Sequence, residues 1–199
     1  MTTSTPVKTT GTSLLALQSI SANGNVVGSS LNVSTYFGGI VFIHFGRTTT
    51  SAPTTGVSFR VEVAATSSTG AGEWFPLTTV ITGITAANGS NNSSSTGATI
   101  TLVSGTGFAA QQIILIADGT LAHTEWARVV SVSTNVLTLE ETLQFSHTTG
   151  TTYNQAEMYA IPLDLSAAGQ LRVVADGSAH NQAFLCEAYV DLFTSVTNV

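Results

Sequence analysis

Apolar and polar residues alternate along much of this chain with the two-residue period of β-strands. In residues 57–63, four apolar side chains alternate with three polar ones, which indicates a strand with one buried face. Residues 40–45 and 184–193 are apolar at most positions, and such runs are typical of strands that are buried on both faces or nearly so. In the second run, Glu187 and Asp191 are expected on the side that faces solvent or a partner. No segment shows the period of a helix.

Four further segments have the composition of strands, and clusters of Gly, Asn, Asp, Ser and Pro separate them as turns. The additional strands are predicted at residues 14–21, 73–80, 156–163 and 170–175. The turns are predicted at residues 23–25, 38–39, 51–53, 70–72 and 176–178. Short strands at this spacing are typical of a β-sandwich or a β-barrel.

A polar run at residues 86–97 interrupts this pattern, and it contains no side chain large enough to pack in a core. We interpret it as a linker or a long exposed loop. Beyond it the pattern predicts a compact unit of four or five short strands, and the first pattern resumes at Tyr153. The short strands are predicted at residues 98–103, 112–116, 125–132 and 136–139.

These observations predict an all-β fold, a jelly-roll-like β-sandwich with an inserted small β-barrel. Residues 1–90 and 152–199 are expected to form one discontinuous sandwich domain, in which residues 1–12 are an N-terminal arm. Residues 91–151 are expected to form the inserted barrel domain. Insertion at a loop costs only the slowly growing entropy of loop closure, so the arrangement is physically reasonable.

The composition is unusual for a free soluble protein, because only 8% of the residues are charged while the mean hydropathy is +0.32. Soluble proteins carry about a quarter charged residues. No apolar run approaches the ~20 residues that span a bilayer, so a membrane partner is not expected. The exterior must consist largely of Thr, Ser, Asn, Gln and Ala, which cost little to desolvate. Such a surface favours lasting contact with neighbouring subunits, and we expect a component of a larger assembly.

The few ionisable residues exclude further classes of function. The formal net charge is −6 and rests on one lysine, four arginines and eleven carboxylates, so no basic stripe exists to bind nucleic acid.

The one cysteine, Cys186, lies in an apolar context and is expected to be buried and inert. The first residues lack the pattern of a secretion signal, so we expect a protein made in the host cytoplasm without processing.

Neither a metal site nor a cofactor is predicted. The four histidines, His44, His123, His147 and His180, are scattered and show no ligand spacing, so we assign them structural or solvent roles. His44 interrupts an apolar strand and is expected to be a hydrogen-bonded imidazole in the core or at an interface.

The carboxylates show no catalytic pair. Glu140 and Glu141 are adjacent, so on a strand they point to opposite faces and cannot act on one substrate. We expect them to end a strand in solvent. Glu125 and Arg128 are three positions apart on a predicted strand, so each is expected to pair with a residue of another strand.

Other chemical motifs are also missing. Asp118 and Asp176 precede glycines and are interpreted as turn residues, although a weak calcium site that includes such residues stays open. Gly105 and Gly107 lack the third glycine, the lysine and the helix of a phosphate-binding loop, and we interpret them as a hairpin turn. No serine lies in a Gly-x-Ser-x-Gly motif. The sequence therefore predicts no enzymatic activity.

Two aromatic pairs, Tyr36–Phe37 and Trp74–Phe75, are candidates for contact with a partner or for a sugar-binding groove. We favour the subunit contact, because a sugar site also needs converging polar and charged groups. The arm is expected to order against a neighbouring subunit. The predicted contact residues are Thr2, Thr3, Pro6, Val7, Lys8, Tyr36, Trp74 and Phe75.

The inserted segment resembles a small β module of tailed-bacteriophage virion structural proteins. In that module a strand is followed by a Gly-Phe turn, an aliphatic strand, a Glu-x-x-Arg-Val strand and a His-x-x-Gly turn. The matching residues of this chain are Gly107, Phe108, Glu125, Arg128, Val129, His147 and Gly150. The chain departs from the module at Gln111 and Gln112, where Gly-Asp is usual. Residues 42–47, 59–63 and 74–77 are similar to the sandwich part of the same kind of protein.

The resemblance implies a virion structural protein located on the capsid surface. It would be a capsid decoration or cement subunit that binds the major capsid protein or other virion subunits and stabilises the phage head. A homo-oligomer is implied as well, by analogy a trimer. The alternative is a glycan- or receptor-binding module of a head fibre or a tail-associated protein.

Overall fold

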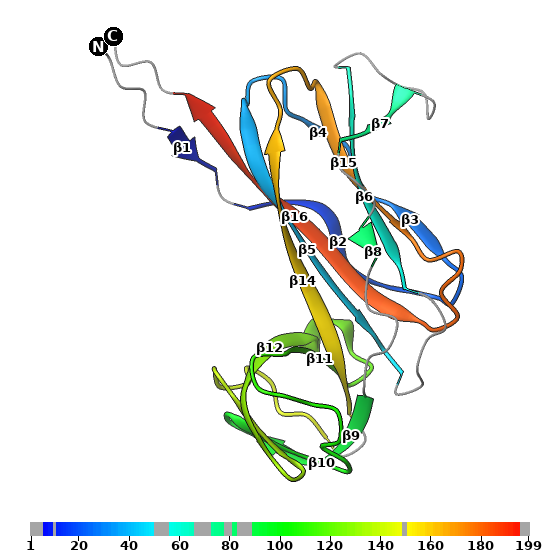
Figure 1. Cartoon of the computed structure of the whole chain (residues 1–199), viewed down its shortest axis with the longest axis vertical. Coiled ribbons are helices and arrows are strands. Elements are labelled where there is room, and N and C mark those ends of the chain that lie inside the picture. The colour runs from blue at the N-terminus through cyan, green and yellow to red at the C-terminus, as the bar shows by residue number, and fades with distance from the viewer. Residues whose placement is uncertain are drawn as a thin grey trace.

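The structure of this 199-residue chain is a computed structural model that describes residues 6–9, 11–49, 56–65, 73–77, 81–82, 89–148 and 151–195. The regular structure of these residues is almost entirely β, as the alternation predicts. A sandwich forms one part of the molecule and a smaller group of strands lies at its end (Figure 1). The strands of the sandwich are β1 (Pro6–Lys8), β2 (Thr12–Ile20), β3 (Asn25–Val27), β4 (Leu31–Asn32), β5 (Gly38–Arg47), β6 (Ser58–Ala64), β7 (Phe75–Pro76), β8 (Ile81–Thr82), β14 (Thr152–Asp164), β15 (Gln170–Asp176) and β16 (Phe184–Ser195).

The sandwich has the strand order of a jelly roll. The first sheet has the order β2-β16-β5-β14, and β1 pairs with β16 on the same side as β2. In the second sheet, β15 pairs with β3, β4 and β6, and β6 pairs with β7 and β8. The chain crosses between the sheets after nearly every strand, which is the double-sheet arrangement of jelly rolls. The predicted all-β, jelly-roll-like sandwich is therefore confirmed.

The other strands close into a ring, which we call the strand ring. Its members are β9 (Gly89–Thr96), β10 (Thr99–Leu102), β11 (Ile113–Ala117), β12 (Glu125–Ser133), β13 (Val136–Leu139) and the first part of β14. The pairing runs β14-β11-β12-β13-β10-β9 and returns to β14. A 3-10 turn, η2 (Leu121–His123), precedes β12. The domain boundaries at 90/91 and 151/152 stay a prediction, because strand pairing alone does not show that the ring folds as a separate unit.

Each region encloses its own apolar core. The sandwich core contains Phe45, Phe59 and Phe184 among aliphatic side chains, and the ring core gathers around Ile100 and Ile114. Cys186 is buried in the sandwich core, as predicted, and burial raises the pKa of its thiol to about 12.

Strand β14 joins the two regions. Its first residues pair with β11 and β9 of the ring, and residues 156–164 pair with β5 of the sandwich. At the junction a Cβ on Gly46 would lie 2.8 Å from the Cβ of Leu115. Glycine therefore allows β5 to approach the ring at this point.

Residues 89–96 correct the interpretation of the polar run, because they form β9 and are not a linker or exposed loop. Side chains of Ser, Asn and Thr gave no sign of a buried face, but the backbone of β9 pairs with β10 and β14. The hydroxyl of the buried Ser95 donates to the carbonyl oxygen of His147 at 3.2 Å. Main-chain pairing, which the side-chain pattern does not report, decides the structure here.

Smaller differences concern turns and short strands. The strands β3 and β4 were not predicted. Gly105 and Gly107 form a turn, but β10 and β11 on either side of it do not pair with each other, so it is not a hairpin. The predicted turns at 51–53 and 70–72 lie outside the described residues, as do residues 78–80 of the strand predicted at 73–80. No helix in the described part of the chain is long and apolar enough to cross a bilayer.

Candidate functional site

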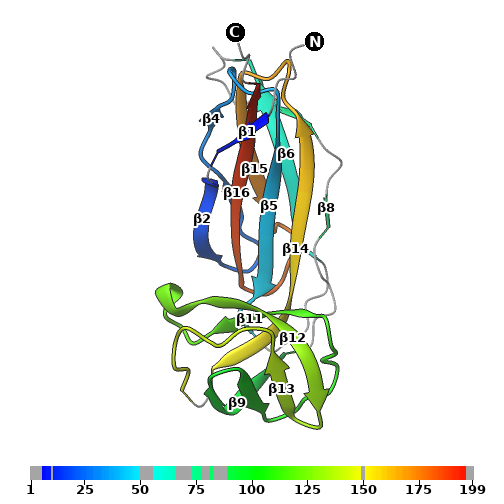
Figure 2. The same ribbon diagram turned by 90° about the vertical axis from the view of Figure 1, so that its left-hand side faces the viewer.

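The outward side of the first sheet forms an apolar surface, which we call the apolar outer face. Figure 2 looks onto it, with β16, β5 and β14 in front of β15 and β6. Its side chains come from three neighbouring strands in register. They are Ile40, Phe42 and His44 of β5, Met158, Ala160 and Pro162 of β14, and Glu187, Tyr189, Asp191 and Phe193 of β16.

The strand register aligns these side chains in rows across the sheet. Ala160, Phe42 and Tyr189 form one row, and Pro162, Ile40 and Asp191 form the next. The outward side of a sandwich sheet is usually polar, because it faces water. On this sheet it is instead aliphatic and aromatic, with Met158 41% exposed.

Aromatic contacts hold the centre of the apolar outer face. The rings of Phe42 and Tyr189 stack with centroids 5.2 Å apart, and the ring of His44 meets the edge of Tyr189 at 5.4 Å. Trp126 of the strand ring contacts His44 at 5.4 Å, so the surface continues onto the ring. Such geometries restrict the side chains and present a preformed surface.

The charges on the apolar outer face are paired within the chain. His44 Nδ1 lies 2.8 Å from Glu187 Oε1, and Lys8 Nζ lies 2.6 Å from Asp191 Oδ2. Burial, followed by the charges of Glu187 and Asp191, raises the pKa of the Tyr189 hydroxyl. Each of the two carboxylates therefore has a partner within the chain, and the surface offers a neighbouring protein mainly hydrophobic contact.

The outward side of the second sheet is different, and we call it the charged outer face. It is formed by Arg60 and Glu62 of β6 and Arg172 and Asp176 of β15. Glu62 accepts hydrogen bonds from Arg60 Nε at 3.2 Å and from Arg172 Nε at 2.8 Å. Arg60 also lies 3.4 Å from Asp176. This face concentrates two of the four arginines and shows the alternation expected of a strand that faces water.

The structure does not bring the predicted contact residues together. Tyr36 packs against the sandwich core, and Trp74 lies under the guanidinium of Arg172, whose Cζ is 4.0 Å from the ring centroid. Phe75 is 65% exposed. Pro6, Val7 and Lys8 form β1 on the edge of β16, whereas Thr2 and Thr3 lie outside the described residues.

The pairing of β1 differs from the expected free arm. Strand β16 extends past the part that β2 covers, so its backbone is open to pairing at Phe193–Ser195. Strand β1 occupies this position, and Leu192 donates its backbone N–H to the hydroxyl of Thr9 at 3.0 Å. The charge of Lys8 is used within the chain, because it pairs with Asp191.

A cluster of ionisable side chains lies in the strand ring, and we call it the ring clasp. It consists of Asp118, Glu125 and His147, whose side chains are largely buried, and of the partly exposed His123. His147 Nε2 lies 2.9 Å from Glu125 Oε1, and its Nδ1 lies 3.4 Å from Asp118 Oδ2. Glu125 also accepts the backbone N–H groups of Gln144 and Phe145 at 2.8 and 3.0 Å.

The ring clasp holds an irregular segment in place. Residues 140–148 contain no strand in the structure, and the carboxylate of Glu125 supplies the acceptors that a strand partner would otherwise provide. Burial raises the pKa of Asp118, but hydrogen bonds from the Thr120 N–H and His123, with the charges of His123 and His147, outweigh it and hold that pKa below 3.8. The sequence singled out Glu125 as a paired carboxylate and His147 as a structural histidine, but it did not predict that the two contact each other.

Two ionic contacts link β12 to the irregular segment. Arg128 lies 3.2 Å from Glu140, and Glu125 contacts His147. Both partners lie in the irregular segment 140–148, so the prediction that each pairs with a residue of another strand is wrong. Asp118 Oδ1 accepts the N–H of Thr120 in a turn. No group of three or more His, Cys, Asp or Glu side chains among the described residues is arranged to hold a metal ion.

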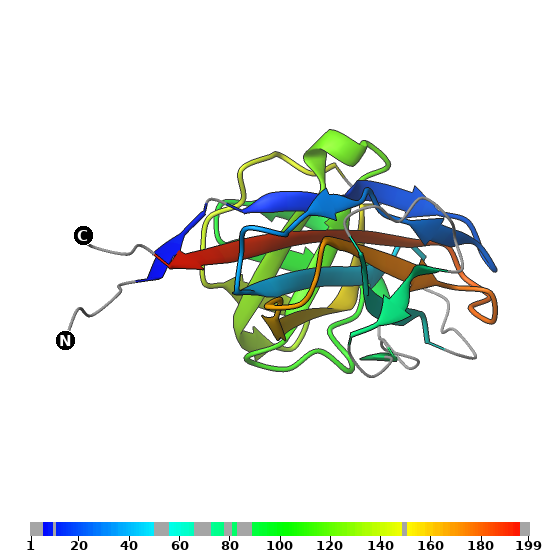
Figure 3. The same cartoon turned by 90° about the horizontal axis from the view of Figure 1, so that it is seen from above.

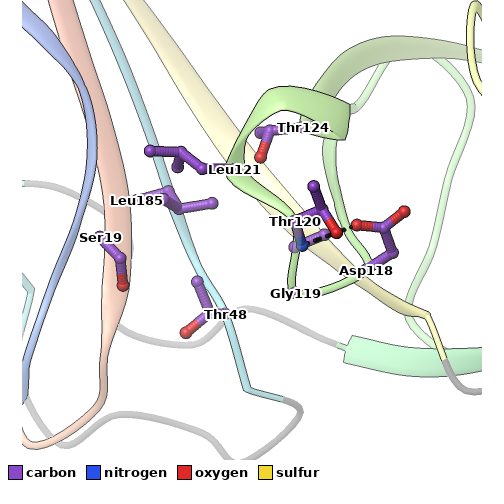
Figure 4. Close-up of a pocket in the computed structure, with 9 residues that line it drawn as sticks. Ser19, Thr48, Asp118, Gly119, Thr120, Leu121, Thr124 and Leu185 are labelled. Carbon is purple, nitrogen blue, oxygen red and sulfur yellow. Dashed lines mark hydrogen bonds between the residues drawn. The ribbon is translucent and has the colours of Figure 1, made fainter.

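A cleft of about 440 Å³ lies between the sandwich and the strand ring (Figure 4). Ser19, Thr48 and Leu185 line it from the sandwich. Asp118 and Thr120 belong to the opposite wall, which the ring provides. Among the described residues, the lining consists of hydroxyls, the Asp118 carboxylate and aliphatic groups, without an aromatic side chain.

Comparison with known proteins gives little further information. No model of a protein family matches the chain, and no curated protein sequence matches it. Among solved structures, a chain in the structure of infectious bursal disease virus, Gx strain, aligns with 97% of this chain and 41% of its own length, at 10% sequence identity and a TM-score of 0.29. This chain thus spans less than half of that viral chain, and a TM-score this low carries no conclusion about function.

Proposed function

We propose that this chain is a non-enzymatic structural subunit of a virion, and within that class a capsid decoration subunit that binds and stabilises an assembled phage head. The observation that carries the role of a structural subunit is the apolar outer face, on a chain with only 8% charged residues, whereas attachment to the head is argued from β1 and the end of β16. Exposed apolar patches of this kind mark contact surfaces between proteins. Its two carboxylates are paired within the chain, which suits permanent contact with other subunits.

The fold is compatible with this role, because jelly rolls are common in viral capsid proteins as well as in lectins. Fold alone does not define function, so the contact surface carries more weight. As a decoration subunit, the chain would stabilise the shell by mass action, since each contact made only with the assembled head adds its binding free energy.

Attachment to the shell is assigned to the end of the sandwich remote from the strand ring. There β1 and the end of β16 extend beyond the other strands (Figures 1 and 3). An isolated two-stranded ribbon is marginally stable in water, so contact with a shell subunit would stabilise it. The strand ring then projects outward.

Particle binding tests the proposal. Purified phage heads that lack the protein are mixed with the full chain and with a variant lacking residues 1–9, and the bound fraction is measured by sedimentation. We expect the full chain to bind and the truncated chain to lose binding while it keeps its circular dichroism spectrum. Lys8→Ala, which removes only the ion pair with Asp191, is the control and should retain binding. Unchanged occupancy by the truncated chain would contradict the assigned attachment site, and no binding by the full chain would reject the function.

The second candidate is a glycan- or receptor-binding module of a head fibre or a tail-associated protein. The observation in its favour is the cleft between sandwich and ring, whose hydroxyls from Ser19, Thr48, Thr120 and Thr124 could bond a polar ligand. A sugar groove at Trp74 is less favourable, because Arg172 covers one face of that ring. Specific glycan binding in an array that is lost in Thr120→Val would support this candidate over the first.

A further inference from the structure

We propose that a second copy of this chain packs against the apolar outer face, sheet on sheet, about a two-fold axis. The inference rests on the proposed function for its assembly role, and it names both the surface and the partner. The shell contact is assigned to the β1 end, so the apolar outer face is available for the second copy.

The chemistry of the face matches that of a sandwich interior. Ile40, Phe42 and Tyr189 lie outward on β5 and β16, and Met158 and Pro162 lie outward on β14. Sheets with apolar side chains pack face to face at about 10 Å, as the two sheets of this sandwich do through their inner faces. Another apolar sheet face is therefore the surface that best complements this one.

Charge favours a second copy over a charged partner. Glu187 and Asp191 are satisfied by His44 and Lys8 of the same chain, so they do not require a basic partner. A two-fold interface uses the same residues on both subunits, so its surface must be complementary to itself. A mainly apolar surface whose carboxylates already have partners within the chain meets this requirement. The charged outer face of the second sheet does not meet this requirement, because its surface consists largely of charged side chains.

The area is close to what specific association needs. The first sheet has four strands, because β2 adds an edge beside the three strands of the apolar outer face. Spaced about 4.8 Å apart, over about seven residues of about 3.3 Å rise, they give roughly 450 Å² of flat surface per copy. Two copies give about 900 Å², which is close to the lower limit of about 1,000 Å² for specific interfaces. The accessible area is larger than this flat estimate, because side chains project from the sheet. Past Met158 the surface meets a cleft of about 240 Å³ in which Ile113 and Trp126 lie beside the charged Glu125, Arg128, Glu140 and Glu141, so the apolar contact ends there.

Ala160 offers the sharpest test, because it is exposed and lies beside Phe42 in the central row of the face. Arginine at this position would place an unpaired charge in both halves of a two-fold interface. We expect Ala160→Arg to weaken self-association at least about 100-fold, since desolvating unpaired charge is costly. The matched control is Val27→Arg on the second sheet, where the replaced side chain is 56% exposed and the change should leave association unaltered.

The experiment is sedimentation-velocity centrifugation of the full chain and both variants between 1 and 100 µM, roughly the range that separates weak from specific association. A wild-type dimer, a folded monomeric Ala160→Arg and a dimeric Val27→Arg support the inference. Met158→Lys serves as a second variant if Ala160→Arg does not fold. A wild-type monomer, a trimer, or a dimer unaffected by both face variants would overturn it.

The same samples are tested for binding to phage heads, so that the two proposals fail separately. A monomeric wild type that binds heads rejects the two-fold packing and retains the proposed function. A dimer that loses association in Ala160→Arg but ignores phage heads retains the packing and rejects the decoration role.

Discussion

The sandwich and the strand ring solve the same problem, closing a β structure around a core, by different means. The sandwich buries a large apolar cluster between two sheets whose strands reach ten or more residues in β5 and β16. The ring has shorter strands and a smaller core, and it holds its irregular segment 140–148 with the buried charges of the ring clasp. A large core makes polar support unnecessary, whereas a small one depends on specific hydrogen bonds.

Strand β14 prevents the two regions from being fully independent. It contributes Tyr153 to the ring core and Leu163 to the sandwich core, so melting either region removes a pairing partner from the other. We expect the ring and the sandwich to unfold together, and the predictions below test this coupling from the largest effect to the smallest.

The largest effects are expected from cavities in the two cores. Phe59→Ala in the sandwich and Ile114→Ala in the ring each remove a fully buried side chain. We expect losses in the free energy of unfolding of about 3–5 and about 2–5 kcal/mol respectively. Urea unfolding followed by circular dichroism and by the fluorescence of Trp126 at the junction, in a Trp74→Phe background, measures both.

If the two regions unfold together, fluorescence and circular dichroism should follow one common transition in Phe59→Ala and in Ile114→Ala. If Ile114→Ala instead shows a first transition by fluorescence and an unchanged second transition by circular dichroism, the ring unfolds alone. That result would establish residues 91–151 as a separate domain, as the sequence pattern predicts.

The apolar part of the fold could be predicted from the sequence because its signal is local. Alternation in residues 57–63 and the apolar runs at 40–45 and 184–193 gave β6, β5 and β16. Strand β9 was missed because its polar side chains do not alternate with apolar ones. Its place in the sheet depends on main-chain pairing with β10 and β14, which the side-chain pattern does not report.

The candidate site could be predicted only in part. Low charge indicated an assembly surface, and the pattern proposed Tyr36, Trp74 and the arm as its contact residues, which stays a prediction. The apolar outer face is visible only when the register aligns Ala160, Phe42 and Tyr189 across three strands far apart in the chain. One sequence feature did indicate the face. Residues 40–45 are apolar at positions that point to both sides of the strand, so the outward side chains were expected to contact protein and not water.

The next largest effect is expected at the ring clasp. Glu125→Ala removes the acceptor for His147 and for the N–H groups of Gln144 and Phe145. Of these partners only His147 is buried, whereas the N–H groups of Gln144 and Phe145 are exposed and can bond to water, so the free energy of unfolding should fall by about 1–3 kcal/mol. Glu125→Gln is the matched control and should cost less, since its amide oxygen still accepts a hydrogen bond. Chemical denaturation at pH 7 measures both variants.

The reactivity of Cys186 shows whether the loss of stability caused by Glu125→Ala in the strand ring also affects the sandwich. Its thiol is buried and its pKa is raised to about 12, so a thiol reagent modifies it only when the sandwich opens. Coupled unfolding predicts faster modification in Glu125→Ala than in the wild type. An unchanged rate in a variant that is clearly destabilised would show that the ring clasp protects the ring alone.

Acid should act on the ring through Asp118. Its folded pKa is held below 3.8 by the Thr120 N–H, His123 and His147, which outweigh burial. A carboxyl with a lowered folded pKa adds stability above pH 3.8, and this contribution is lost as the pH falls through the folded pKa. We expect Asp118→Asn to be less stable than the wild type near neutral pH and to show a shallower loss below pH 4, a bound taken from the ordinary carboxyl pKa of about 3.9. Parallel acid-dependence curves for the two proteins would contradict this role.

The smallest effect is expected from the exposed ion pair on the same ring strand. Arg128 Nε lies 3.2 Å from Glu140 Oε2, but their side chains are 44% and 59% exposed. Water and salt screen such a pair, so Arg128→Ala should change the free energy of unfolding by less than about 1 kcal/mol, and Glu140→Gln should do the same.

Glu125, three positions away on β12, is the comparison. Its side chain is 11% exposed, so its replacement should lower the free energy of unfolding several times more. Urea unfolding at low and high salt separates the two, because only the exposed pair should lose its contribution in salt. A cost at Arg128 equal to that at Glu125 would mean that proximity of charges, and not burial, sets the stability of the ring.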